Sequence, residues 1–590
     1  MAGPRFFGLL ALAVLALCAG YAALVLSSAT WEQARGLDAI FPFYPWRTRA
    51  FSAAAFANTR AGLGVAAGVL GGTFAVLLRS ARNRAEWRAL GQELANAAAA
   101  WLDGLRALSP RQRQLAMGGL LALSALRVFF SVTNPEYDDA VSYEVFVSKG
   151  LLATSAYYPI PNNHIFSNTL SLLFYQASPG FWWSMRLPVL LISTGATVFW
   201  FAGLRRRASF RGAALATGLF SGLQLSLYHA GVGRGYWLMI GVAGVVFFAA
   251  LRLAEGGGPR RAAWSALVVA GVLGCYTVPP FVYVLASAFS WVALRAVVRG
   301  QWTEVGPLAA AGGLIGLGTA ALYAPLLLVS GLARLVGNGY VSSQPPGLFW
   351  RGLPAYAWHI EGFLAGQRTL GALLTLPVLA LVGGLLCRAR AGRLPADLAR
   401  RLQQLGSPAL WFWGLPYALL VAQRVFPPER VLLYKAFFFF ILVGLLADAA
   451  LTYWAAGRGP RRALAAGLLL FAGYETYSVV RVNPAARGTN AAYHAGLCWL
   501  AARPPGPVLV PEPTHNLFFR FYAHSEMRQR SWRIDETQRD TTRYAYVVAF
   551  PNKRGFFQPE FPFPPAYHNA EVEIYAVPPA YPLRTQAWRH

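Results

Sequence analysis

The chain has 590 residues, of which 56% are hydrophobic and only 13% are charged, and its net charge is +28. Charged residues make up about a quarter of a soluble globular protein, so this composition argues against a soluble protein. The arginines gather at the ends of apolar segments, as in membrane proteins, and we expect no nucleic-acid partner. The four cysteines show neither metal-ligand spacing nor the pattern of a disulfide framework.

The apolar residues come in long, nearly uncharged segments. A helix needs roughly 20 apolar residues to cross the hydrocarbon core, where its backbone polar groups must be satisfied internally. We therefore predict an all-α polytopic membrane protein with about 13 transmembrane helices, followed by a small C-terminal α/β domain. The predicted spans are 6–27, 60–78, 115–131, 187–204, 211–228, 235–253, 262–277, 279–297, 306–330, 370–387, 408–423, 431–452 and 462–480.

The arginines also predict the orientation. If the N-terminus is inside, every dense arginine cluster falls on one side of the membrane: 79–88, 111–113, 205–211, 260–261, 388–401 and 458–462. The positive-inside rule makes that side cytoplasmic. We expect a multi-pass protein of the inner (plasma) membrane of a bacterium, with a cytoplasmic N-terminus and an extracytoplasmic C-terminal domain.

Three parts are predicted along the chain. Residues 1–114 are an N-terminal two-helix addition, with an inward amphipathic helix around 87–108 on the membrane surface. Residues 115–483 are the transmembrane core, whose first outward loop is 133–186. Residues 484–590 are rich in Pro and charge, and they contain a predicted helix at 490–502 and strands at 507–511, 544–550 and 571–577.

The first outward loop carries the candidate chemistry. The run Tyr137-Asp138-Asp139-Ala140 lies just beyond a predicted span. Two adjacent carboxylates repel each other, so they are costly to hold together unless they bind a proton or a cation. Such a carboxylate can take a proton from an acceptor or hold a metal. The alternative is that the two aspartates simply cap a surface helix that starts near Ala140.

These residues resemble a motif of the C-type membrane glycosyltransferases (GT-C), in particular the protein mannosyltransferase and aminoarabinose transferase superfamily (glycosyltransferase family 39 and its bacterial relatives). The resemblance covers roughly 115–530. Its matching residues are Tyr137, Asp138, Asp139, Ala140, Asn163, His164, Arg186, Leu187, Pro188, Gly233-Arg234-Gly235-Tyr236 and Pro427-Pro428-Glu429-Arg430. The chain departs from the pattern at Asp139, where Glu is commoner, and at His164-Ile165-Phe166, which replaces His-Pro-Pro. The first two spans precede the family core.

The resemblance implies transfer of a sugar from a polyprenyl-phosphate donor to an extracytoplasmic glycan, lipid or protein acceptor. It implies Asp138 as the general base of an inverting displacement, and Asp139 as an orienting acid or the ligand of a possible divalent cation. Arginine binds phosphate oxygens bidentately, so cations at the outer ends of spans are assigned to the donor phosphate: Arg186, Arg234, Arg430 and Lys435. The candidates for substrate binding are Tyr137, Asn163, His164 and Tyr236.

Purely structural roles for these residues stay open as alternatives. The arginines could be snorkelling residues at the interface, and His164 could be structural. Two other functions also suit a polytopic protein: a transporter or flippase of a lipid-linked saccharide, and a non-catalytic scaffold of envelope assembly. Transporters usually carry ionisable residues near the bilayer midplane, whereas here they fall at predicted span ends, which favours the enzyme.

Overall fold

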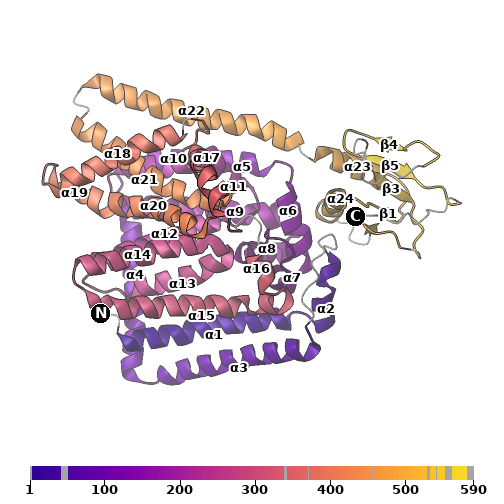
Figure 1. Cartoon of the computed structure of the whole chain (residues 1–590), viewed down its shortest axis with the longest axis horizontal. Coiled ribbons are helices and arrows are strands. Elements are labelled where there is room, and N and C mark those ends of the chain that lie inside the picture. Colours follow the sequence, from indigo (N-terminus) through magenta and orange to yellow (C-terminus); the bar gives the residue numbers. More distant parts are fainter. Residues whose placement is uncertain are drawn as a thin grey trace.

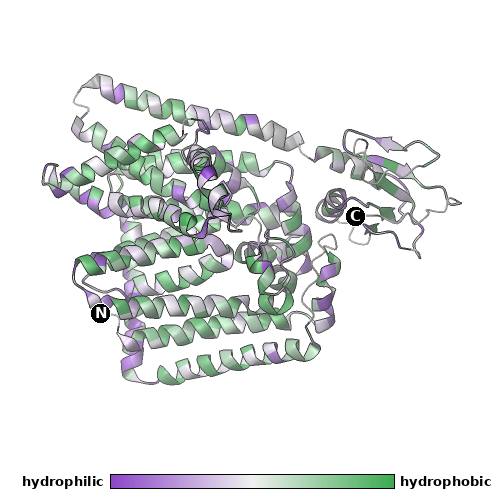
Figure 2. Ribbon diagram, viewed as in Figure 1, coloured by the Kyte–Doolittle hydropathy of each residue, from purple (hydrophilic) through white to green (hydrophobic). Residues whose placement is uncertain are grey.

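The structure is a computed structural model that describes residues 3–40, 51–337, 342–369, 371–454, 457–488, 490–527, 532–539, 541–549, 551 and 561–580. Most of the chain forms a bundle of helices that run side by side, and a small α/β unit lies beyond one end of the bundle (Figure 1). Hydrophobic residues cover the length of the bundle helices, while hydrophilic residues gather at its two ends (Figure 2).

Within the described residues, 11 helical segments are long and apolar enough to cross a membrane, and each matches a predicted span. They are α1 (Pro4–Ser27), α3 (Ala53–Leu77), α5 (Pro110–Ser131), Trp182–Arg205 with α9 (Leu187–Arg205), α12 (Tyr236–Glu255), Pro279–Val298 with α14 (Val282–Val298), Trp302–Val329 with α15 (Val305–Val329), α18 (Gly371–Arg390), Ala396–Gln423 with α19 (Ala396–Arg401) and α20 (Ser407–Gln423), Glu429–Tyr453 with α21 (Leu433–Ala449), and Gly459–Arg481 within α22 (Arg458–Gly488). The all-α polytopic fold class is confirmed.

The other two predicted spans are not among these 11. The predicted span 262–277 is present as the apolar helix α13 (Arg261–Thr277), which at 17 residues is shorter than the others. The predicted span 211–228 is two helices, α10 (Phe210–Gly222) and α11 (Gln224–Gly231), because Leu223 between them is extended, with ψ 133°. A break exposes backbone groups that hydrocarbon cannot satisfy. Here the buried carboxylate of Glu475 from α22 accepts the N–H of Gln224 at 2.7 Å.

The bundle has a clear centre and periphery. The most apolar stretch of α12 is 72% buried, and that of the Glu429–Tyr453 segment is 83% buried. The corresponding stretches of α3 and α22 are only 0% and 11% buried. The central helices interlock through aromatic rings; Trp200 of α9, for example, packs on Phe437 of α21 with centroids 3.6 Å apart. The outer helices therefore present apolar surface to lipid.

The helix α4 (Ala81–Arg106) contains most of the predicted amphipathic segment. It crosses the ends of the spans at the left of Figure 1 and contacts α1, α9 and α13. Arg261 at the start of α13 forms ion pairs with Glu86 at 2.8 Å and with Glu93 at 3.0 Å. Its inward orientation stays a prediction, as do the domain boundaries at 114 and 483.

The tail forms a five-stranded sheet in the order β2-β1-β3-β5-β4. Its elements are α23 (Ala491–Ala501), β1 (Val508–Leu509), α24 (Pro513–Ser525), β2 (Ile534–Asp535), β3 (Tyr546–Ala549), β4 (Tyr567–His568) and β5 (Glu573–Ala576). β1 is parallel to β2 and β3, and β5 is antiparallel to β3 and β4. The predicted helix and three strands are present, whereas α24, β2 and β4 were not predicted.

The first outward loop folds into short helices at the end of the bundle nearest the α/β unit (Figure 1): α6 (Tyr137–Val141), α7 (Leu151–Ala156) and α8 (Ile165–Ala177). The remaining helices are α2 (Trp31–Arg35), α16 (Leu332–Val336) and α17 (Pro346–Leu364). This end of the bundle holds the candidate site.

Candidate active site

The aspartate pair lies in the first turn of α6, which begins after the N-cap residue Glu136. Consecutive helical residues point in different directions, so the two carboxylates separate. The side chain of Asp138 is 41% exposed, whereas that of Asp139 is fully buried. Neither aspartate is the N-cap, because the helix begins before Ala140; Asp139 is instead the third helical residue, and its Oδ2 accepts the N–H of Glu136 at 3.5 Å as part of a capping box. Asp138 has a different environment.

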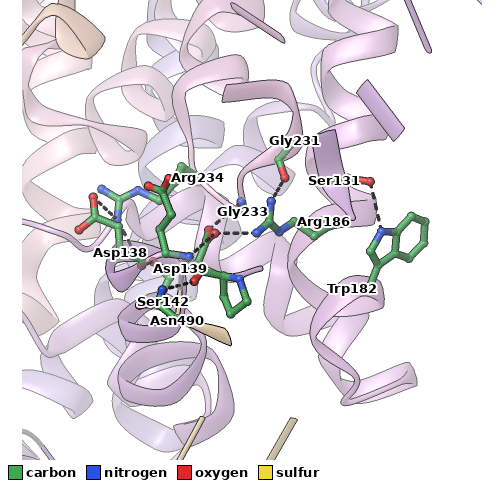
Figure 3. Close-up of polar contacts among 12 residues, drawn as sticks. Ser131, Asp138, Asp139, Ser142, Trp182, Arg186, Gly231, Gly233, Arg234 and Asn490 are labelled. Atoms are coloured by element: carbon green, nitrogen blue, oxygen red, sulfur yellow. Dashed lines mark hydrogen bonds and ion pairs between the residues drawn. The ribbon is translucent and has the colours of Figure 1, made fainter. Parts of the chain in front are cut away.

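Asp139 is held by protein donors. Its Oδ2 lies 2.8 Å from Nη2 of Arg186, and its Oδ1 accepts the N–H of Gly233 at 3.0 Å. Figure 3 shows Arg186 between Asp139 and the carbonyl oxygen of Gly231, to which its Nη1 also donates. A buried ion pair is kept only when further hydrogen bonds satisfy its remaining polar atoms, and these contacts supply them. Asp139 thus fixes α6 to the turn that follows α11.

That turn carries Arg234 and explains its glycines. A Cβ on Gly233 would lie 2.9 Å from Cβ of Met185, and one on Gly235 would lie 3.0 Å from Nδ1 of His164. Only glycine lets the backbone approach this closely. Arg234 is 4% exposed, and its Nη1 lies 3.6 Å from Oδ2 of Asp138.

His164 lies against the same arginine from the other side. Its Nδ1 accepts the N–H of Gly235 at 2.9 Å, so its proton is on Nε2, and the 3.2 Å approach of Nε2 to Nη2 of Arg234 is then a contact between two donors and not a hydrogen bond. Burial and the guanidinium of Arg234 hold the pKa of His164 well below its usual range. His164 is therefore neutral at physiological pH, and it packs edge-on against Tyr236 with centroids 4.8 Å apart.

A cavity of about 760 Å³ opens in front of these residues. Seven of the predicted site residues line it, although they come from four separate parts of the chain: Tyr137, Asp138, Asn163, His164, Arg234, Tyr236 and Arg430. Asp138 is the one carboxylate among the described lining residues, and it shares the cavity with the guanidinium groups of Arg234 and Arg430. A single carboxylate facing two cations suits an acid–base reaction on an anionic ligand.

Three predicted site residues do not line this cavity. Asp139 and Arg186 pair with each other behind it, so neither contacts a ligand there, and their assignments to catalysis and to the donor phosphate are corrected. Lys435 of α21 is fully buried and lies 3.0 Å from Oε1 of Glu361 in α17, so it is also removed from the phosphate-binding set. Burial of a cation requires a nearby anion, and Glu361 supplies it.

Asn163 lines the cavity but its amide has structural partners. Its Nδ2 donates to the carbonyl oxygens of Thr154 and Tyr157 at 2.8 and 3.0 Å, and its Oδ1 accepts from Nδ2 of Asn168 at 2.9 Å. These bonds fix the loop that carries His164. The substrate-binding prediction for Asn163 is therefore limited to contact along the cavity wall.

Asp139 does not fit the predicted role of a cation ligand. Both oxygens of Asp139 accept from protein donors, and the described residues contain no group of three or more His, Cys, Asp or Glu side chains that could hold a metal. The possible cation at Asp139 is corrected accordingly.

Sequence reasoning missed Tyr158, Asn162, Tyr283 and Gln423, which also line the cavity. Asn162 donates to the carbonyl oxygen of Asp138 at 3.3 Å, and Tyr283 donates to Oε1 of Gln423 at 2.6 Å. Asn162 adjoins the Asn163-His164 motif, which was its one signal. Tyr283 and Gln423 lie in apolar helices with no motif, and only the fold brings them to the cavity.

The C-terminal α/β unit is attached next to α6 through charge. Glu144 is fully buried, and its carboxylate lies 3.0 Å from Nζ of Lys149, 2.8 Å from Nδ1 of His524 and 3.6 Å from Nε of Arg520. Burial alone would raise the pKa of Glu144, but His524, Lys149 and Arg520 outweigh burial and lower that pKa to about 2. α24 is thereby fixed against the helix that carries Asp138.

The chain matches no protein-family model and no curated protein. Its fold is similar to two crystal structures of ArnT from Cupriavidus metallidurans. The structure of ArnT bound to undecaprenyl phosphate is 14% identical to this chain, with a TM-score of 0.50, and the match covers 78% of this chain and 97% of the ArnT chain. The structure of ArnT in the apo state is also 14% identical, with a TM-score of 0.53, and the match covers 79% of this chain and 98% of the ArnT chain. This chain therefore has the same fold as ArnT over most of its length.

Proposed function

We propose that the protein is a membrane glycosyltransferase that moves a sugar from a polyprenyl-phosphate donor to an acceptor hydroxyl on the extracytoplasmic side. The observation that carries the proposal is the shared cavity: a half-exposed Asp138 carboxylate faces the guanidinium groups of Arg234 and Arg430. The ArnT crystallised with undecaprenyl phosphate supports a lipid-linked phosphate as the ligand class.

The reaction follows from the charges. Asp138 takes the proton of the acceptor hydroxyl as its oxygen attacks the anomeric carbon. The bond between that carbon and the phosphate oxygen breaks, and the polyprenyl phosphate leaves with the bonding electrons. Arg234 and Arg430 bind the phosphate, where negative charge increases during the reaction. One base and one displacement invert the anomeric centre.

Asp139 contributes indirectly as a positioning residue. It binds the N–H of Gly233, the residue before Arg234, and thus sets the distance between α6 and the phosphate-binding arginine. Ser142 also fixes α6, because its hydroxyl donates to the carbonyl oxygen of Asp138 at 2.8 Å. Placement to within an ångström matters because small misplacements cost large factors in rate.

The charge distribution supports an extracytoplasmic site. The arginine clusters around 79–113, 205–211 and 388–401 flank the opposite ends of the spans from the loop that carries Asp138. By the positive-inside rule those clusters are cytoplasmic. In the inner (plasma) membrane of a bacterium, the N-terminus is then cytoplasmic, and the cavity and the C-terminal α/β unit are extracytoplasmic.

Two structural features favour the alternative of a flippase for a lipid-linked saccharide. The break between α10 and α11 and the buried carboxylate of Glu475 beside it are of the kind that transporters use. The two functions predict that the lipid-linked sugar accumulates on different leaflets. In source-organism membranes that lack this chain, loss of the transferase leaves the lipid-linked sugar on the outer leaflet, whereas loss of a flippase leaves it on the inner leaflet.

The experiment is mass spectrometry of lipid and glycan extracts from such membranes, with lectin access to right-side-out and inverted vesicles reporting the leaflet. We expect the lipid-linked sugar to accumulate on the outer leaflet and one glycan to disappear. Accumulation on the inner leaflet alone would overturn the transferase in favour of the flippase.

A further inference from the structure

A second hollow lies at the arginine-rich end of the bundle and shares no lining residue with the candidate active site. It is a groove of about 500 Å³ between the end of α4 and the helices α5, α9 and α10. Its walls are almost entirely apolar, with Leu105, Leu120 and Phe201 among them. Arg106 and Arg113, both exposed, are the two charged side chains of its described lining.

The two arginines mark one end of the groove. Arg106 is the last residue of α4, and Arg113 lies in the first turn of α5. From Arg113 the groove follows α5 to Leu123, ten residues further, which is about 15 Å of helix. The hydrocarbon core of a bilayer is about 30 Å thick, so the groove spans about one leaflet.

The small residues of the groove border unfilled space. A Cβ on Gly119 of α5 or on Gly218 of α10 would meet no atom within 4 Å. Glycines that serve close helix packing behave differently; a Cβ on Gly444 would lie 2.6 Å from the carbonyl oxygen of Gly212. At Gly119 and Gly218 the groove is therefore open, and no other element packs against these two positions.

The floor of the groove contains a polar atom without a protein partner. Thr217 is 4% exposed, and its Oγ1 has no hydrogen-bond partner among the described residues. The neighbouring Thr197 differs, since its Oγ1 accepts from Nη2 of Arg127 at 2.7 Å.

We propose that this groove binds one anionic phospholipid of the adjoining leaflet, with its phosphate between Arg106 and Arg113 and one acyl chain along α5 as far as Leu123. The length of the groove matches one leaflet, its walls match an acyl chain, and its cations match a phosphate. The site is independent of the proposed sugar transfer.

Two pairs of variants test it in the full-length protein. In Gly119→Leu a side chain fills the groove, whereas Gly118→Leu puts the same side chain on α5 outside the groove lining, and a Cβ at either position meets nothing within 4 Å. Arg106→Ala with Arg113→Ala removes both cations of the groove. The matched control is Arg388→Ala with Arg393→Ala, which removes two exposed arginines elsewhere at the same end of the bundle.

The measurement is native mass spectrometry of the protein released from nanodiscs that contain equal phosphatidylglycerol and phosphatidylcholine. We expect one retained phosphatidylglycerol, lost in Gly119→Leu and kept in Gly118→Leu. Retention should fall about fivefold for each arginine removed from the groove, because each contributes about 1 kcal/mol, and it should not fall in the control pair. Equal retention of the two lipids, an equal loss in both glycine variants, or retention of a polyprenyl phosphate instead would overturn the proposal.

Discussion

Replacing Asp138 with Asn tests the assignment of the base, because the structure predicts a large loss of rate with little loss of stability. Ser142 and Asn162 bind the carbonyl oxygen of Asp138, not its carboxylate, so Asn keeps both hydrogen bonds. The variant loses the 3.6 Å ion pair with Arg234. With the Asp138 side chain 41% exposed, that pair is worth at most about 1 kcal/mol.

The expected catalytic effect is much larger. A positioned general base contributes about 10²- to 10⁴-fold in rate, which corresponds to about 3–5 kcal/mol of activation free energy. Transfer should therefore fall by at least about a hundredfold, while binding of undecaprenyl phosphate stays within a few-fold of the wild type. Transfer is measured by mass spectrometry of the glycan product in membranes that carry the variant, and binding by titration of the purified protein in nanodiscs.

Asp139→Asn is the matched control, because it removes the same charge one residue away. It leaves Arg186, which is 1% exposed, without its anion, and breaking such a buried pair costs about 3–5 kcal/mol. This variant should lose thermal stability, whereas Asp138→Asn should not. The reasoning is refuted if Asp138→Asn transfers sugar at the wild-type rate, or if the two variants lose stability equally.

Three further perturbations follow from the same geometry. Arg234→Ala and Arg430→Ala should each weaken the binding of undecaprenyl phosphate by about 10- to 150-fold in nanodisc titrations, because hydrogen bonds to charged groups are worth about 1.5–3 kcal/mol. Unchanged affinity in both variants would contradict their assignment to the phosphate. Lys435→Met should lower the thermal unfolding midpoint by leaving Glu361 buried without its cation, and adding Glu361→Gln should restore most of it; a lone Lys435→Met as stable as wild type contradicts the pairing. The pKa of Glu144 lies at about 2, below its ordinary value of 4.5, so its ionised form stabilises the fold by about 3 kcal/mol above pH 4.5, and this is lost as the pH falls from 4.5 through 2. Urea unfolding at pH 6 and pH 3 should show about 2 kcal/mol of that loss in the wild type and a smaller loss in Glu144→Gln; equal losses would contradict this assignment.

The sequence alone determined the membrane fold class, because hydrocarbon imposes a length and a composition on any helix that crosses it. Its resemblance to a known motif also proposed Asp138, Arg234 and Arg430 as site residues, and the structure places all three on one cavity. The glycines around Arg234 belong to such a motif, and the structure gives their physical reason: the backbone there lies against Met185 and His164.

The tertiary structure decided which charges are free to meet a ligand. Arg186 and Lys435 have the same sequence signal as Arg234, yet each is neutralised by a partner 47 or 74 residues away, Asp139 and Glu361. The break at Leu223 likewise depends on Glu475, whose hydrogen bond to Gln224 joins residues 251 positions apart. Apolar periodicity and short motifs are local, whereas the neutralisation of a buried charge depends on which helices pack together, and that is settled only when the whole bundle folds.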